Sequence, residues 1–161
     1  MTTTTGFHPT RRLILQGAAS VALLGLGNLP FVPAYAAAND KYPEDAFKLK
    51  NEADAIEALY GKTAEPSDKI KLDAPEIAEN GGVVPISVTT TLDKVTSISF
   101  LVAENPNALA ASYRIADGTL PSVANRLKMA KTTNVTAIVE ADGKLYSATK
   151  EVKVTVGGCG G

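Results

Sequence analysis

From residue 70 onward, apolar and polar side chains alternate with the period of two that is typical of β-strands. In the clearest run, Val84, Ile86 and Val88 share one face and the residues between them share the other. Turn signals such as Asp117-Gly118 and Asp142-Gly143 separate the runs. The pattern predicts seven strands, at 70–74, 84–90, 98–102, 109–115, 122–129, 135–140 and 144–156. Strands so closely spaced, with no helices between them, indicate a mainly β fold, an immunoglobulin-like antiparallel β-sandwich.

Residues 44–60 have a helical pattern instead, and they predict one or two short helices packed on the side of the domain. Pro43 and the acids after it suit a first turn, and Asn51 is a suitable N-cap for a second helix. Apolar residues then recur at helical spacing up to Tyr60, and Gly61 is well placed to end the helix.

The first 36 residues have the features of an export signal. Arg11 and Arg12 precede an apolar run that ends near Leu29, and the small-residue motif Ala34-Tyr35-Ala36 follows as a cleavage site. Adjacent arginines indicate the twin-arginine route, which exports folded proteins to the periplasm. A transmembrane anchor is the alternative, but the run is short for a bilayer span of about 20 residues. We therefore expect a signal peptide at 1–36, a β-sandwich domain at 37–156 and a tail at 157–161.

Removing the signal changes the chemistry that the chain can offer. The 16 basic residues fall to 14 against 17 acidic ones, a net charge of −3, and His8, the single histidine, is lost. Without histidine, a Ser-His-Asp or Cys-His nucleophile cannot form, and the usual zinc and copper sites lack ligands. A mildly acidic chain also gives no electrostatic footprint for nucleic acid. We expect no cofactor, no metal and no catalytic residue in the mature protein.

The last five residues hold the one cysteine, Cys159, between the glycine pairs Gly157-Gly158 and Gly160-Gly161. Glycine loses more conformational freedom on ordering than any other residue, so this tail is expected to act as a swinging arm. Three residues after Val156 extend the thiol by at most about 10 Å. A lone cysteine is usually a small buried hydrophobe, but no element is available here to hold it in a core. Cys159 is therefore the candidate attachment point for a substrate.

Little in the tail would activate that thiol. Nucleophilic attack needs the thiolate, and the nearby carboxyl terminus would oppose its formation. We expect other proteins to supply the activation, with Cys159 presented to their active sites in turn.

The chain ending resembles that of the SoxY family, the sulfur-carrier subunits of the bacterial sulfur-oxidising system. The Gly-Gly-Cys-Gly-Gly ending is the specific feature, and the twin-arginine signal agrees with it. Further similar segments lie at 78–86, 104–107 and 142–146, so that the resemblance covers the chain from about residue 42 to its end.

The resemblance implies a function and a set of partners. It implies a heterodimer with a SoxZ-like subunit, and thiosulfate joined oxidatively to Cys159 by a SoxXA-like c-type cytochrome. A SoxB-like hydrolase would then release sulfate, and in some systems a SoxCD-like sulfane dehydrogenase would oxidise the remaining sulfur. In this interpretation the chain is no enzyme itself but the substrate of its partner enzymes.

Three other functions stay open on the residues alone. Cys159 could crosslink an exported structural or interaction module. The final Gly160-Gly161 could belong to a ubiquitin-like conjugation module, although such proteins need adenylation in the cytoplasm. A stand-alone thiol enzyme would need a base that the mature chain lacks.

Overall fold

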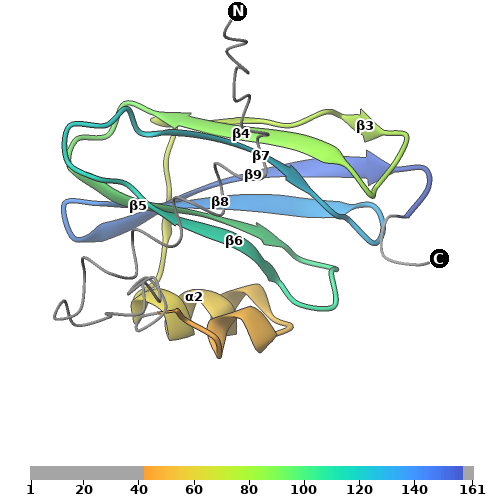
Figure 1. The fold of residues 1–161 in the computed structure, drawn as a ribbon, viewed down its shortest axis with the longest axis horizontal. Coiled ribbons are helices and arrows are strands. Elements are labelled where there is room, and N and C mark those ends of the chain that lie inside the picture. Colours follow the sequence, from red (N-terminus) through yellow and green to blue (C-terminus); the bar gives the residue numbers. More distant parts are fainter. Residues whose placement is uncertain (1–41, 158–161) are drawn as a thin grey trace, which may run out of the picture. The chain divides into compact units, whose positions relative to one another are not determined.

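A computed structural model describes residues 42–157 of the 161-residue chain. Its helices are the 3₁₀ helix η2 (Ala46–Lys48) and α2 (Glu52–Tyr60). Its strands are β1 (Glu65–Pro66), β2 (Ile70–Asp73), β3 (Ile77–Ala78), β4 (Val84–Thr90), β5 (Val95–Val102), β6 (Leu109–Arg114), β7 (Ser122–Leu127), β8 (Thr133–Ala141) and β9 (Lys144–Val154). The predicted mainly β fold is confirmed, and the described residues form an immunoglobulin-like sandwich (Figure 1).

Local signals define the ends of α2. The side chain of Asn51 accepts a hydrogen bond of 2.8 Å from the Ala53 N–H, which satisfies one of the free donors of the first turn. Gly61 has a φ of +64°, and its N–H closes the helix on the Glu57 carbonyl. The predicted short helices are therefore confirmed. Neither described helix has the length and apolar character needed to cross a membrane.

The strands form two sheets. The larger sheet has the order β1-β9-β8-β5-β6, with β3 also paired to β9, and the smaller has the order β2-β4-β7. All pairs are antiparallel except those of β9 with β1 and with β3, which are parallel. The larger sheet lies between the smaller one and α2 (Figure 1).

The main core fills the space between the two sheets. From β4 it takes Val84, Ile86 and Val88, all at most 2% exposed, and from β5 the fully buried Phe100. The ring of Phe100 meets that of Tyr113 edge to face, with centroids 6.3 Å apart. The alternation predicted for 84–90 thus places one face of β4 in the core.

A second apolar cluster lies between the larger sheet and the helices. Leu101, Ile138 and Leu145 pack there with Ala55 of α2. Tyr60, the last residue of α2, joins Ser97 and Ser99 of β5 through hydroxyl contacts of 3.0 and 2.7 Å. Because the sheet is covered on both faces here, β5 and β8 are buried almost continuously instead of in alternation.

The β8–β9 connection is the predicted hairpin. Ala141 pairs with Lys144, so the loop consists of Asp142 and Gly143 alone, with φ of +49° and +74°. Positive φ at both positions is the geometry that an Asp-Gly pair favours. The last strand, however, ends at Val154, two residues before its predicted end. Val156 is consequently 64% exposed and does not extend the buried face of β9.

Candidate functional site

Most of the predicted functional residues lie outside the described part of the chain. These are Arg11 and Arg12 of the export signal, and Gly158, Cys159, Gly160 and Gly161 of the tail. Gly157 is described, and so is the point where the tail leaves the sandwich. We call residues 155–157 the tail root. Its surroundings show how the sandwich holds the start of the tail that leads to Cys159.

On one side, the tail root is bound to β3 and the loop after it. The parallel pairing of β9 with β3 continues past the end of β9, since the Thr155 N–H donates to the Ala78 carbonyl over 3.1 Å. The Thr155 hydroxyl donates to the Glu79 carbonyl over 2.8 Å. One residue further, the Val156 carbonyl accepts a 2.7 Å hydrogen bond from the Gly81 N–H. Backbone pairing therefore holds the chain up to the residue before Gly157.

On the other side, the tail root contacts the loop 128–132 between β7 and β8. Just before the root, the Thr132 hydroxyl accepts from the Val154 N–H at the end of β9 over 2.9 Å. At Gly157 the approach is much closer, because a Cβ built on its backbone would lie 2.3 Å from the Ala130 carbonyl oxygen. Real Cβ atoms do not come that near to an oxygen, so the chain can take this path only with glycine at 157.

Asn105 fixes the loop that carries Ala130. Its amide nitrogen donates to the Lys128 carbonyl over 2.7 Å, and its amide oxygen accepts from the Ala130 N–H over 2.9 Å. The Met129 N–H between them donates to the Gly81 carbonyl over 2.7 Å. Asn105 thus holds the loop 128–132 on one side. On the other side, Gly81 of the β3–β4 loop connects the loop 128–132 to the tail root.

An ion pair lies on the outside of the same loop. The Lys131 ammonium is 2.8 Å from the Glu104 carboxylate. The hydrogen bond from Lys131, and then its positive charge, lower the pKa of Glu104. Both side chains are more than half exposed, so this pair contributes little to stability.

Three exposed aliphatic side chains belong to the segments around the tail root. Ile77 of β3 is 60% exposed, Val83 of the β3–β4 loop is 55% exposed, and Val156 belongs to the root itself. Single exposed apolar residues are common on protein surfaces. Here they belong to segments that are hydrogen-bonded to one another, at the end of the sandwich from which the tail departs.

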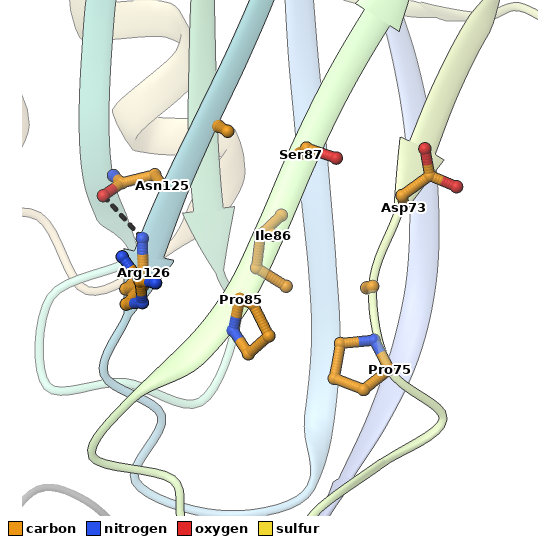
Figure 2. Close-up of a pocket in the computed structure, with 9 residues that line it drawn as sticks. Asp73, Pro75, Pro85, Ile86, Ser87, Asn125 and Arg126 are labelled. Atoms are coloured by element: carbon orange, nitrogen blue, oxygen red, sulfur yellow. Dashed lines mark hydrogen bonds between the residues drawn. The ribbon is translucent and has the colours of Figure 1, made fainter.

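A shallow groove of about 480 Å³ lies on the smaller sheet (Figure 2). It opens where β2 leaves β4, since their pairing stops at Asp73 and Ser87. Pro85 has no N–H to continue a ladder there, and Pro75 lies opposite it (Figure 2). Asp73 and Arg126 add opposite charges to the lining. Among residues 42–157 there is no cluster of three or more potential metal ligands, in this groove or elsewhere.

A larger groove of about 890 Å³ runs between α2 and strands β8 and β9. Glu52, at the start of α2, lines it and has one carboxylate oxygen that is buried without a hydrogen-bond partner. Burial raises the pKa of Glu52, and a hydrogen bond from Thr136 partly offsets this. Sequence reasoning missed Glu52 as a candidate functional residue, because the charge of an acid in the first turn of a helix does not reveal what covers it.

Comparison with known proteins places the chain in a family. The sequence model described as "Sulfur oxidation protein SoxY" matches residues 56–159. The structure of the sulfur carrier protein SoxY from Chlorobium limicola f thiosulfatophilum is 43% identical, with a TM-score of 0.59. The match covers 65% of this chain and 96% of that one. The superoxide reductase (neelaredoxin) of Ignicoccus hospitalis is 21% identical over 53% of this chain and 80% of its own, with a TM-score of 0.47.

A search of curated proteins found no match. The family match nevertheless spans more than half of the chain, and the SoxY of Chlorobium limicola is matched over nearly its whole length. The chain belongs to the SoxY family of sulfur oxidation proteins.

Proposed function

We propose that this protein is a covalent carrier of sulfur intermediates, with Cys159 as the attachment point and the glycines around it as the arm. The observation that carries the proposal is that the family match runs to residue 159 itself, the cysteine of the Gly-Gly-Cys-Gly-Gly ending. Its Chlorobium relative, matched over 96% of its length, is described as a sulfur carrier protein.

The chemistry begins with an oxidative conjugation. The Cys159 thiol and thiosulfate lose two electrons and one proton, and a sulfur–sulfur bond forms to give Cys–S–S–SO₃⁻. A c-type cytochrome of the SoxXA type accepts the electrons. Water then cleaves the terminal sulfur–sulfur bond in a SoxB-like hydrolase, which releases sulfate and a proton and leaves the persulfide Cys–S–SH. A SoxCD-like dehydrogenase, where one is present, oxidises that remaining sulfur.

The tail root is suited to presenting a thiol. Cys159 lies two residues beyond Gly157, so its Cα is at most about 7 Å from that of Gly157. Any enzyme that acts on the sulfur must therefore approach the end of the sandwich that carries Ile77, Val83 and Val156. These exposed aliphatic side chains offer an apolar surface at the point where contact is unavoidable.

Family membership also supports a partner subunit and a compartment. We propose that the chain pairs with a SoxZ-like subunit and works in the periplasm. Arg11 and Arg12 would direct it through the twin-arginine route, which accepts folded proteins and so allows a pre-assembled pair to cross.

Intact-mass spectrometry tests the carrier function directly. The protein is exposed to a thiosulfate-oxidising extract and measured with and without reductant, beside the Cys159→Ser variant. We expect a reductant-labile adduct of thiosulfate or sulfane sulfur on the wild-type terminal peptide, no adduct on Cys159→Ser, and loss of thiosulfate-dependent electron transfer in that variant.

Two results would contradict the carrier function. One is normal turnover by Cys159→Ser in a reconstituted mixture. The other is a wild-type protein that forms only a disulfide-linked homodimer, which would instead favour a crosslinking module.

A further inference from the structure

We infer that Gly157 is a positioning residue held against the sandwich, and that it forms the fixed base of the arm that carries Cys159. This inference rests on the proposed carrier function and assigns Gly157 a part in it. Composition alone does not distinguish the four tail glycines, because it carries no information on what surrounds each of them. At Gly157 the structure shows a backbone atom, the Ala130 carbonyl oxygen, that leaves no room for a side chain.

The contact partner of Gly157 cannot easily move away. A Cβ at 157 would meet the carbonyl oxygen of Ala130 at 2.3 Å and its carbonyl carbon at 3.3 Å, so the clash is with backbone and not with a flexible side chain. The Ala130 N–H is bound by Asn105, and the Met129 N–H by the carbonyl of Gly81. The loop is thus held at the contact residue itself and at the residue before it.

The same hydrogen bonds return to the tail root. Gly81 accepts from Met129 through its carbonyl and donates to the Val156 carbonyl through its N–H. The loop 128–132, Gly81 and Val156 are therefore linked by hydrogen bonds into a ring that closes at the contact between Gly157 and Ala130. A side chain at 157 has to push either the Ala130 carbonyl or the tail outward, and each movement strains a hydrogen bond of this ring. The Gly81 N–H bond to Val156 is the one nearest the displaced tail.

This arrangement defines the direction in which the arm leaves. With residues up to 157 held, only Gly158 separates the held chain from Cys159. The direction of the Gly157 carbonyl then limits the region that the sulfur can visit. An enzyme that receives Cys159 gains from this, because a thiol confined near one exit direction loses less freedom on entering an active site.

Two variants of the full chain test the inference. Gly157→Ala and Gly158→Ala are compared by amide hydrogen exchange at Gly81 and Met129. Small-reagent thiol reactivity and the rate of partner-dependent thiosulfate conjugation are then measured. Overpacking of a fixed backbone contact predicts exchange at the Gly81 amide about tenfold faster in Gly157→Ala, with no change in Gly158→Ala. Conjugation by the partner falls in Gly157→Ala, while reactivity with a small disulfide reagent stays at the wild-type value.

A double-mutant cycle with Asn105→Ala identifies the contact responsible. If the Ala130 carbonyl is the obstacle, releasing its loop lets the carbonyl yield, and Gly157→Ala then has a smaller effect on Gly81 exchange. Equal exchange in Gly157→Ala and wild type, or additive effects in the cycle, would overturn the inference. The exchange measurement needs no sulfur adduct, so it stands or falls independently of the carrier function.

Discussion

The side chain of Asn105 holds the loop 128–132 that contacts the tail root, and replacing this side chain gives a quantitative prediction. Asn105 makes two hydrogen bonds to the backbone of loop 128–132, of 2.7 and 2.9 Å. Alanine removes both, and it leaves the Ala130 N–H, in a part-buried position, without its acceptor. Each such hydrogen bond contributes about 1 kcal/mol net, so Asn105→Ala lowers the free energy of unfolding by about 2 kcal/mol.

Urea denaturation measures this change, and a matched control lies two residues away. Asn107 is exposed in the same turn and makes no side-chain hydrogen bond within residues 42–157. With a slope of about 2 kcal/mol/M, Asn105→Ala lowers the urea midpoint by about 1 M. Asn107→Ala changes the free energy of unfolding by less than about 0.5 kcal/mol.

A third variant separates the two hydrogen bonds. Asn105→Asp keeps an oxygen that can accept from the Ala130 N–H but loses the donor to the Lys128 carbonyl, so it is expected to fall between wild type and alanine. The reasoning fails if Asn105→Ala and Asn107→Ala have the same midpoint, or if the slope m changes enough to show that the unfolded state is affected instead.

Two further predictions concern α2 and its contact with the larger sheet. The raised pKa of Glu52 means that the folded protein holds this proton at a pH where the unfolded chain has lost it, so the group costs stability as pH rises past 4.5, its ordinary value. The urea midpoint of Glu52→Gln relative to wild type is therefore higher at pH 7 than at pH 4, and a difference independent of pH would refute this. Tyr60→Phe leaves two buried serine hydroxyls without their shared partner and lowers the free energy of unfolding by about 1–2 kcal/mol. Tyr42→Phe, at a side chain 56% exposed, serves as control in the same thermal melts, and equal melting temperatures would contradict the assignment.

Elements with a local cause were predictable from the sequence. The alternation in β4, the N-cap at Asn51 and the Asp142-Gly143 hairpin each follow from a few neighbouring residues, and each is confirmed. β1 and β3 were not predicted. Each has only two residues and exists because it pairs with β9, about 80 positions along the chain, so no local pattern reveals it.

The tail root shows the same limit more sharply. Composition identifies a run of glycines around Cys159, but it cannot indicate that Gly157 lies against the carbonyl of Ala130. That contact arises from the meeting of three loops, and its key side chain, Asn105, has in sequence only the signal of a turn residue before proline. Close approach between distant backbone segments is a property of the packed fold.

The parallel pairing of β3 with β9 has a mechanical consequence. In the proposed carrier cycle, an enzyme that takes up Cys159 would pull on the end of β9 along the strand axis. On one side β9 is bonded to β8 from Lys144 to Val152, and on the other to β1 and β3 at Tyr146–Ser147 and Lys153–Val154. Such a pull loads these hydrogen bonds together in shear, whereas a pull across the strand would break them one after another. The pairing of β9 on both edges is therefore arranged to resist force in the direction that the proposed carrier cycle would apply.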